Sequence, residues 1–531
     1  MKQKILLLFV FAFLFFTSKD LWAQDGTLDY SFGDSGRITN LMGSQSVQVK
    51  DGDNHIMFFS NEPLYDIYNY EYDSLIVSRF SFNGTLDSSF GTNGIIVYPQ
   101  TDDIYIAAAD RTPDGKFIVL EYSAAVSSSV LIRFLKTGEI DSSFGVNGTV
   151  IIPHAATVKV DIDGKIVCAD GITSSPNSII RVMRFLQNGA VDSSFGTNGI
   201  SEILLRSSHL RIRLLEFQSD NKIIASGIFD DPDVPFYRYR SHFIVSRFTT
   251  NGRVDSSFNK NGYNYLKTNF GIDYLNAVLS APDNGMIAAG SIGGRYDEYS
   301  STYSGGEFGM VKLFENGSVD TAFGNQGWTI CPIGKSNDSS SYIASLALQP
   351  DGKIVAGGGY YREYEYDNSK FALCRINQNG LCDSTFGNNG IAITDFISLY
   401  PNNSVIASID NLYIEGDGKL LAVGNIYAGD NYNGWTCGAA FARYNNATIL
   451  PISLPTFTAT KKQNTSLLQW HTCSETNCKG FTIERSADNK IFTTIGFAAN
   501  KGGGATCNNN YTFIDNSPLT GTNYYRLKIL D

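Results

Sequence analysis

One six-residue pattern recurs seven times along this 531-residue chain, and it limits the fold more than any other feature. It reads LDYSFG at 28, LDSSFG at 86, IDSSFG at 140, VDSSFG at 191, VDSSFN at 254, VDTAFG at 319 and CDSTFG at 382. Its aspartates are Asp29, Asp87, Asp141, Asp192, Asp255, Asp320 and Asp383, so 354 residues over six intervals give a mean period of 59. Such a period indicates a repeat architecture, in which neighbouring units bury a continuous core.

Two further motifs recur once per unit in the same order. The first is a turn followed by an apolar run, as in DGKFIVL at 114, DGKIVCA at 163 and DGKIVAG at 351. The second is an apolar run that ends in a base and an aromatic or apolar residue, as in VLIRF, FIVSRF and AFARY. Seven copies of each motif define seven units.

Each unit is expected to contain four short strands. The first follows the SFG turn, the second precedes the DGK turn, the third follows that turn, and the fourth is the run ending in the base. Asn-Gly pairs after the fourth strand, such as Asn83-Gly84 and Asn188-Gly189, are strong hairpin signals. Four-stranded units repeated radially predict an all-β fold, a seven-bladed β-propeller over residues 24–447.

The spacing of the motifs also predicts how the ring closes. The strand-end base and the next motif Asp are eight residues apart in every internal unit, from Arg79 and Asp87 to Arg375 and Asp383. Asp29 has no such base before it, and Arg443 has no such Asp after it. We therefore expect the segment around Asp29 to dock beside the strand of Arg443, so that the two ends complete one unit.

A residue pattern that occurs seven times is expected to be structural, because an active site needs one constellation. The Asp and Ser side chains of the motif can accept or donate hydrogen bonds in the turn, the Phe can fill the core between units, and the Gly can adopt a positive φ. Oxygen-rich DGK turns also permit a calcium interpretation, but Asp161 to Gly164 lack the later acidic ligands of a calcium loop. A plain turn is therefore favoured, and we expect neither a metal nor a cofactor.

These three motifs, in this order and at this period, closely resemble the delta-60 repeat family of bacterial secreted proteins. The resemblance covers residues 25 to about 446. It implies a β-propeller and export, and no activity.

A second domain is expected over residues 448–531, after the Pro-punctuated segment ILPISLPTF. Strand-like runs at short spacing indicate a fibronectin type III-like β-sandwich, with Trp470 as its core aromatic and Tyr524 or Tyr525 as its late-strand tyrosine. The segment resembles the module that precedes the sorting domain in cargo of type IX secretion, but no last strand or sorting domain follows, so we expect a truncated module. Cys473, Cys478 and Cys507 are expected to be free thiols or to form one disulfide, and a zinc site is disfavoured.

Composition and the first residues indicate where the protein works. Lys2 and Lys4 precede the apolar run 5–16, which has the length of a signal-peptide core, so residues 1–23 are expected to be a cleaved signal peptide and the protein to be extracellular or on the outer cell surface. With 18% charged and 13% aromatic residues the chain is not disordered. A net charge of −11 without a basic block argues against nucleic acid as a partner. We expect a monomer without a membrane span, in contact with an export machinery.

A search for catalytic motifs is mostly negative. The five histidines, at 55, 154, 209, 242 and 471, stand apart in the sequence, and no zinc-protease, nucleophile-elbow or phosphate-loop motif is present. Two carboxylates on different blades would leave no sequence signature, so a polysaccharide-active enzyme, a hydrolase or lyase, is the alternative to a non-catalytic protein.

The loops between the third and fourth strands carry the one feature that the repeat does not explain. Five of them expand, at 61–74, 230–242, 291–308, 359–370 and 425–438, and together hold 15 of the 29 Tyr residues. The candidate binding residues are Tyr70, Tyr72, Tyr237, Tyr239, Tyr296, Tyr299, Tyr361, Tyr364, Tyr366 and Trp435. Strand alternation places all these loops on one face of the disc, opposite the DGK and SFG turns. Aromatic and acidic side chains on such loops suit recognition of carbohydrate or protein, although the Tyr residues could equally cover long loops or extend sheet edges.

Overall fold

The structure is a computed structural model. It describes residues 24–40, 46–52, 54–65, 71–99, 104–123, 128–174, 177–207, 209–230, 241–268, 272–281, 283–297, 302–334, 339–362, 368–400, 403–430, 434–446, 456–462, 464–472, 479–487, 492–501 and 509–530. The expected signal peptide and Cys473, Cys478 and Cys507 lie outside these residues. The described fold is all-β, with a single 3-10 turn, η2 (Ile397–Leu399). None of the described helical residues forms a helix long and apolar enough to span a membrane.

Six antiparallel sheets follow one another along the chain, each in simple up-and-down order. The first three are β2 (Ser46–Lys50), β3 (His55–Tyr65), β4 (Glu71–Ser81) and β5 (Ile95–Pro99); β6 (Ile104–Arg111), β7 (Phe117–Ser123), β8 (Ser128–Phe134) and β9 (Thr149–Pro153); and β10 (Thr157–Val160), β11 (Ile166–Ser174), β12 (Asn177–Phe185) and β13 (Ile200–Arg206). The next three are β14 (Leu210–Phe217), β15 (Ile223–Asp230), β16 (Ser241–Phe248) and β17 (Tyr263–Leu266); β18 (Ile272–Ser280), β19 (Met286–Asp297), β21 (Glu307–Leu313) and β22 (Trp328–Cys331), with β20 (Thr302–Ser304) paired to β19; and β23 (Ser339–Leu348), β24 (Ile354–Arg362), β25 (Lys370–Ile376) and β26 (Ile391–Thr394). Each sheet takes its last strand from the start of the next sequence unit.

A seventh sheet joins the two ends of the repeat region. β27 (Ser404–Ile414), β28 (Leu420–Asp430) and β29 (Gly434–Tyr444) pair with β1 (Arg37–Asn40) from the N-terminal side. The backbone N–H of Asp29 donates to the carbonyl oxygen of Arg443 over 2.8 Å. The predicted closure is therefore confirmed.

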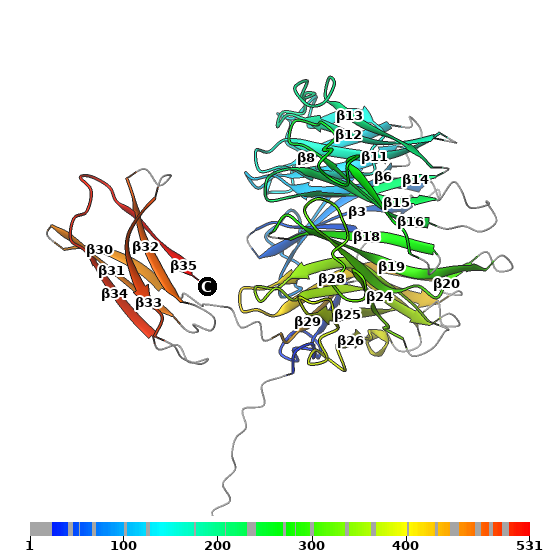
Figure 1. Cartoon of the computed structure of the whole chain (residues 1–531). Helices are drawn as coiled ribbons and strands as arrows, with labels where there is room; N and C mark the ends of the chain where they lie inside the picture. The colour runs from blue at the N-terminus through cyan, green and yellow to red at the C-terminus, as the bar shows by residue number, and fades with distance from the viewer. Residues whose placement is uncertain are drawn as a thin grey trace, which may run out of the picture.

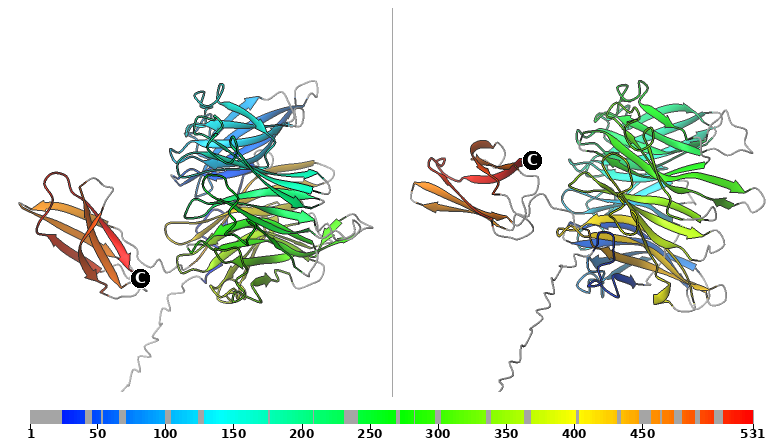
Figure 2. Two further views of the ribbon diagram at one scale, coloured as in Figure 1. Left: turned by 45° about the horizontal axis from the view of Figure 1, so that its top comes forward. Right: turned by 60° about the horizontal axis from the view of Figure 1, so that its bottom comes forward.

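The first strands of the seven sheets lie next to one another around a ring. Consecutive first strands, from β2 to β27, contact each other. The last and first are joined by side chains, because Gln48 Nε2 of β2 donates to Asp410 Oδ2 of β27 over 3.0 Å. Figures 1 and 2 show the resulting disc, with β19 and β20 projecting from one of its sides. The opposite side carries the tight turns, since those turns lie at the other end of β19.

Five of the first strands carry a β-bulge at the same level, four residues before the strand ends. The extra residues are Ala107, Arg213, Asn276, Ala344 and Asp410. Opposite four of these bulges the second strand has a glycine, at which a Cβ would lie 1.9 Å (Gly227) or 1.8 Å (Gly290, Gly358, Gly424) from a backbone oxygen of the first strand. The glycine that directly follows motifs such as DGKIVAG, Gly358 in that unit, is therefore required by the close approach of two backbones.

The apolar cores lie between neighbouring sheets. Phe90 of one motif packs with Phe117 and Phe134 of the following sheet, and all three are almost fully buried. Gly138 lies so close to this ring that a Cβ there would be 2.1 Å from a ring carbon of Phe90. The expectation that the motif Phe fills the core between units is confirmed.

Two further sheets of three strands lie in the C-terminal region. They are β30 (Thr456–Lys462), β31 (Thr465–Thr472) and β34 (Asn509–Asp515), and β33 (Thr493–Ala499), β32 (Gly480–Ser486) and β35 (Tyr524–Leu530). Trp470 is 2% exposed and stacks on Tyr511 at 5.1 Å between ring centroids, so its core position is confirmed. Tyr525 is the inward member of the late pair, because its hydroxyl donates to Asp515 Oδ2 over 2.9 Å, whereas Tyr524 is 41% exposed.

Candidate functional site

The repeated motif forms one contact set on the tight-turn side of every sheet. In six units the strand-end Arg donates from Nε to the Oδ2 atom of the motif Asp. The distances are 2.8 Å for Arg79–Asp87, Arg247–Asp255, Arg375–Asp383 and Arg443–Asp29, and 2.9 Å for Arg133–Asp141 and Arg184–Asp192. In the remaining unit Lys312 Nζ lies 3.1 Å from Asp320 Oδ2. We call this contact set the Arg–Asp staple.

The other groups of the motif complete the staple. In the unit of Asp192, Ser194 donates to Asp192 Oδ1 from its hydroxyl over 2.5 Å and from its backbone N–H over 3.2 Å. The Arg184 guanidinium lies 4.5 Å from the ring centroid of Phe195 and donates to the carbonyl oxygen of Thr250 in the next unit. This staple, like those of Arg133 and Arg247, therefore holds its own turn and the neighbouring sheet, as expected of a structural element.

The electrostatics of the staple follow from these contacts. Burial opposes ionisation of Asp192, but hydrogen bonds from Ser194 and Lys165, together with the charge of Arg184, outweigh burial and lower the pKa to about 2. At Asp87 the hydrogen bond from Ser89 is the main cause of a pKa lowered to about 2. These carboxylates are charged at neutral pH, and their oxygens already accept hydrogen bonds from neighbouring groups of the protein.

The motif glycine behaves as expected in six units. Gly145, for example, has φ = 53°, and a Cβ there would lie 2.1 Å from the carbonyl oxygen of Thr149. Asn259 takes the same place with φ = 47°, so the position is not closed to all other residues. Asparagine tolerates this region better than most side chains.

The DGK turns use their first carboxylate as a local acceptor. Asp161 Oδ1 accepts backbone N–H groups from Asp163 over 2.9 Å and Lys165 over 2.8 Å. Lys165 then reaches Asp192 Oδ2 at 3.1 Å. These contacts are those of a plain turn tied to the staple. Among the described residues no group of three or more His, Cys, Asp or Glu side chains could hold a metal ion.

The predicted aromatic loops are only partly within the described residues. Tyr70, Tyr237, Tyr239, Tyr299, Tyr364 and Tyr366 lie outside them. Tyr72, Tyr296 and Trp435 lie on strands, in register with Leu64, Tyr303 and Gly429 respectively. The expectation of loops over 61–74, 291–308 and 425–438 was therefore wrong for much of each range, because β3–β4, β19–β20 and β28–β29 extend as hairpins. Alternating aromatic residues favour an extended strand there.

Tyr361 is the predicted residue whose side chain the structure places in a pocket. The pocket has a volume of about 290 Å³ and lies between the sheet of β18–β19 and the sheet of β23–β24, on the side opposite the tight turns. It is lined by Tyr274, Asn276, Ser291, Gly294, Gly306, Ser340, Ser341, Tyr342 and Tyr361. The volume is close to the lower end of the ~300–1,000 Å³ range of small-molecule sites. We call it the tyrosine pocket.

Tyr342 is held in the pocket by its neighbours. It pairs in register with Gly359, where a Cβ would lie 2.8–2.9 Å from its ring atoms and hydroxyl. Burial is the main cause that raises the pKa of Tyr342, and the charge of Asp410 adds to it despite a hydrogen bond from Ser408. The phenol therefore stays protonated at neutral pH and remains able to donate a hydrogen bond.

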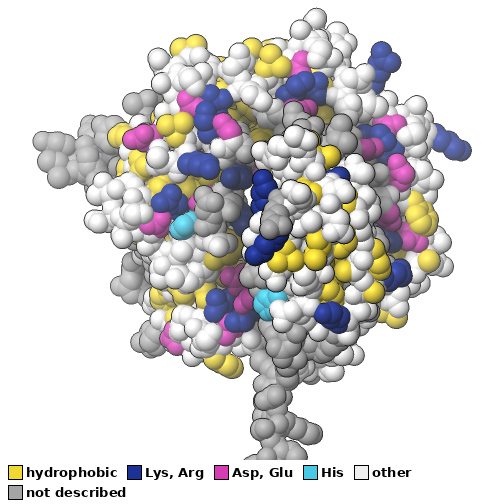
Figure 3. Space-filling view, turned by 90° about the vertical axis from the view of Figure 1, so that its left-hand side faces the viewer, with side chains coloured by type: hydrophobic (Ala, Val, Ile, Leu, Met, Phe, Trp, Pro, Cys, Tyr) yellow, Lys and Arg dark blue, Asp and Glu magenta, His cyan; other side chains and the backbone are white. Residues whose placement is uncertain are grey.

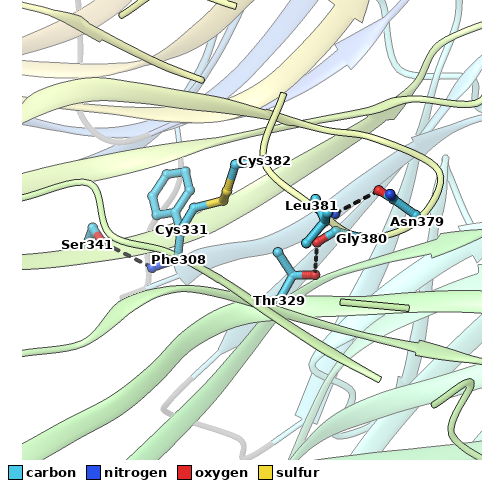
Figure 4. The surroundings of a disulfide bond; sticks show 8 residues. All are labelled: Phe308, Thr329, Cys331, Ser341, Asn379, Gly380, Leu381 and Cys382. Atoms are coloured by element: carbon cyan, nitrogen blue, oxygen red, sulfur yellow. Dashed lines mark hydrogen bonds between the residues drawn. A yellow bond between two sulfur atoms is a disulfide. The ribbon is translucent and has the colours of Figure 1, made fainter. Parts of the chain in front are cut away.

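The wall of the pocket is fixed from both sheets. The backbone N–H of Gly305 donates to Ser340 Oγ over 2.7 Å, and that of Phe308 donates to Ser341 Oγ over 3.1 Å. A disulfide between Cys331 on β22 and Cys382 after β25 joins the same two sheets, and Thr329 Oγ1 donates to the carbonyl oxygen of Gly380 beside it over 2.6 Å (Figure 4). The pocket thus lies between two cross-linked sheets, which favours a preformed site.

Behind the pocket, Asp410 forms a polar network across the ring closure. Its Oδ2 atom accepts hydrogen bonds from Gln48 Nε2 over 3.0 Å and Asn425 Nδ2 over 2.5 Å. Burial raises the pKa of Asp410 to about 6, although the two hydrogen bonds act to lower it. No Lys or Arg lies on the first strands of the three sheets at this side of the ring, β18, β23 and β27.

Three histidines that stand apart in the sequence meet carboxylates in the fold. His154 Nδ1 lies 2.7 Å from Asp170 Oδ2, His242 Nδ1 lies 3.3 Å from Asp273 Oδ2, and His55 Nε2 lies 3.7 Å from Asp87 Oδ2. His242 and Asp273 are fully buried, whereas the His154 side chain is 44% exposed.

Sequence reasoning missed most of the pocket. Tyr274, Asn276 and Tyr342 lie on first strands, and nothing in the repeat distinguishes them from core positions. The sequence does hold one signal that could have found two of them. Tyr274 and Tyr342 each lie six residues before the end of the first strand, and the same position holds Tyr105, Arg211 and Ser408 in other units. A position that varies in size and polarity among otherwise similar units does not face a common core.

Comparison with known proteins supports the fold. Residues 218–258 and 349–386 match the model of a family described as "Domain of unknown function (DUF5122) beta-propeller". No curated protein matches the chain. Together with the sheets described above, this match establishes a β-propeller fold.

Solved structures give only distant similarities. Prolyl oligopeptidase B from Galerina marginata aligns with a TM-score of 0.37 and 11% identity over 83% of this chain, which spans 56% of that protein. Polysaccharide lyase Uly1 aligns with a TM-score of 0.33 and 10% identity over 90% of this chain and 98% of that one. Similarities at this level carry no argument about activity.

Proposed function

We propose that this protein is a secreted or cell-surface, non-catalytic seven-bladed β-propeller of the delta-60 repeat type that binds carbohydrate through its tyrosine pocket. The C-terminal sheets would form a fibronectin type III-like module of the kind found in type IX secretion cargo. Residues 1–23 would act as the export signal.

The tyrosine pocket is the observation that carries this proposal. Three half-buried phenols, Tyr274, Tyr342 and Tyr361, surround a preformed hollow that also presents Asn276 and Ser291. Aromatic faces can stack on sugar rings, while hydroxyl and amide groups exchange hydrogen bonds with sugar hydroxyls. The Arg–Asp staples cannot serve this purpose, because their polar atoms are already paired within the protein.

A polysaccharide-active enzyme is the second candidate, and one pair of residues favours it. Asp170 holds Nδ1 of His154, and a histidine held in this way can exchange protons through its other nitrogen. Tyr122 lies against the His154 ring at 4.8 Å between centroids. Among the described residues Asp170 is the one carboxylate paired with His154, and a glycoside hydrolase needs two, so binding is favoured over chemistry.

A glycan array probed with the full-length mature chain, followed by a turnover assay on each retained glycan, separates the two candidates. Retention without product, lost in Y361A and kept in H154A, supports binding. Product release that disappears in H154A would support the enzyme. Retention of no glycan would contradict the proposed function.

A further inference from the structure

We propose that the carbohydrate bound in the tyrosine pocket is anionic and that Arg211 and Arg213 of β14 receive its acidic group. This inference rests on the proposed binding function and specifies its ligand as an acidic sugar, one that bears a carboxylate or a sulfate. Neither arginine belongs to the repeated motifs.

Strand register places both arginines at the level of the pocket. β14 ends at Phe217 and β18 ends at Ser280, each followed by the same type of tight turn. Counting back from those ends, Arg211 and Tyr274 are both six residues away, and Arg213 and Asn276 are both four residues away. β14 and β18 contact each other, and Leu214 and Tyr274 pack against one apolar cluster. Each arginine therefore lies on the strand next to a pocket residue of the same level.

The backbone directs Arg213 away from the sheet core. The register of β14 shifts between Ile212 and Leu214, which leaves Arg213 as the extra residue of a bulge, and β18 shifts in the same way around Asn276. A bulge re-aims the side chain it carries and is frequent beside binding sites. Arg213 is exposed and forms no ion pair with any described residue.

Arg211 is already oriented for a ligand. Its Nε donates to His209 Nε2 over 2.6 Å, which holds the guanidinium while leaving the two terminal nitrogens for other acceptors. A guanidinium offers a planar pair of donors that matches the two oxygens of a carboxylate or sulfate. Arg211 is exposed, so such a group can reach it from solvent.

The charge around the ring is one-sided. The first strands of four consecutive sheets, β2, β6, β10 and β14, carry five bases, Lys50, Arg111, Lys159, Arg211 and Arg213, against two acids, Asp110 and Glu216. Lys159 lies 4.0 Å from Glu216 and is further balanced by Asp110, which raises its pKa. Of the five bases, Arg211 and Arg213 lie at the level of the pocket, whereas Lys50, Arg111 and Lys159 lie at or next to the strand ends on the tight-turn side. Figure 3 views the tight-turn side, where Lys and Arg side chains lie beside a hollow near the centre of the disc.

A positive wall beside an aromatic wall fits one class of ligand better than others. A neutral sugar would use the phenols and leave the arginines unpaired. An acidic peptide would use the arginines, but it would have no need of stacked aromatic faces. An acidic sugar uses both, because its ring can lie on tyrosine while its charged group lies toward β14.

The test uses matched glycans on the full-length mature chain. An array carries oligogalacturonates, alginate oligomers and sulfated galactans, each beside its methyl-esterified or desulfated form, so that charge changes while the sugar backbone is kept. We expect about tenfold stronger retention of an acidic form than of its neutral form at low salt, shrinking as salt screens the contact. The double variant R211Q/R213Q should lose this preference while keeping affinity for the neutral form within about twofold. R253Q, which removes one positive charge from an exposed turn on the opposite side, should behave as the wild type, and the single variants R211Q and R213Q match it in charge.

The outcomes separate the two levels of the proposal. Equal retention of acidic and neutral forms would overturn the acidic-sugar inference and leave carbohydrate binding intact. A preference that persists in R211Q/R213Q would also overturn it. Retention of no glycan by the folded wild type would overturn the binding function, and this inference with it. Unchanged thermal unfolding of R211Q/R213Q shows that its loss of preference is not caused by misfolding.

Discussion

The two sides of this disc differ in a way that tells structure from function. On the tight-turn side, each sheet repeats the Arg–Asp staple, or its Lys312–Asp320 counterpart, with nearly constant distances. On the opposite side, between β18–β19 and β23–β24, the tyrosine pocket uses positions that vary from sheet to sheet, such as that of Tyr274 and Tyr342, where other sheets have Arg211 or Ser408. Contacts that recur in every unit hold the ring together, whereas a site that binds one ligand needs a constellation that occurs once.

The largest effect should come from breaking a buried staple. Arg247 is 1% exposed and holds Asp255 Oδ2 at 2.8 Å and Ser257 Oγ at 3.0 Å, so R247A leaves a buried carboxylate with only the more distant Lys222, at 3.7 Å, as its base. We expect the free energy of unfolding to fall by about 3–5 kcal/mol in urea titrations. The control is R181A, which breaks the more exposed pair with Glu202 and should cost less than about 1 kcal/mol. Equal losses in the two variants would contradict a special role for the staples.

Removing the disulfide should have the next largest effect. Cys331 and Cys382 are 51 residues apart in sequence and join two adjacent sheets, so the double variant C331S/C382S should lose about 2–4 kcal/mol of unfolding free energy. Dithiothreitol should shift the wild type by the same amount and leave the double variant unchanged. If dithiothreitol reduces the Cys331–Cys382 disulfide of the wild type without lowering its free energy of unfolding, this contribution is contradicted.

Acid should weaken the staple side. The pKa of Asp192 is about 2 in the folded protein, below the ~3.9 of an unfolded Asp, so its contribution is present above pH ~4 and is lost as pH falls through 2. The expected loss is about 2 kcal/mol for this one group. Urea unfolding at pH 7, 4 and 2.5 measures it, and D192N should show a smaller decline than the wild type over the same range. Parallel declines in the two proteins would contradict the assignment.

The opposite pH dependence is expected from Asp410. Its folded pKa, about 6, lies above the unfolded value, so its contribution is present below pH ~4 and is lost as pH rises through 6. Between pH 5 and 7 the wild type should therefore lose stability relative to D410N. A difference between the two proteins that does not change over this interval would refute the raised pKa.

The smallest effect on stability is expected from G359A. The added Cβ would lie 2.8 Å from the Tyr342 ring, which can shift within the pocket, so we expect a cost of about 1 kcal/mol. Glycan affinity should fall by about tenfold, because the displaced phenol no longer lines the pocket. G416A is the control, since open space surrounds Gly416. Unchanged affinity in G359A would remove Tyr342 from the site.

The sequence predicted what the repeat encodes. The strands, the closure of the ring at Asp29 and Arg443, and the buried motif Phe follow from positions that recur in register. The constant eight-residue spacing of Arg and Asp was visible, but their ion pair was not inferred, because spacing alone does not say that two turns fold toward each other. Trp470 was also predicted correctly, since a single large aromatic residue in a strand pattern has few alternatives to the core.

The pocket was beyond sequence reasoning for a physical reason. Tyr274 and Tyr342 are almost seventy residues apart and meet only because first strands of consecutive sheets lie side by side in the ring. The bulges at Arg213 and Asn276 shift the alternation of their strands, so a period of two assigns side chains to the wrong face beyond that point. Clustering of tyrosines in loops pointed to the correct side of the disc, but of the ten candidates only Tyr361 is seen to line the pocket.

The central claim is that the staple side supports the fold and the pocket side binds the ligand. Isothermal titration with the best glycan from the array, paired with a thermal unfolding curve for each protein, tests it on Y361A and R247A. We predict that Y361A binds at least about tenfold more weakly with an unchanged unfolding temperature, whereas R247A unfolds at a lower temperature but binds as the wild type when folded. Wild-type affinity in Y361A, or a loss of affinity in both variants that follows their unfolding, would contradict the claim.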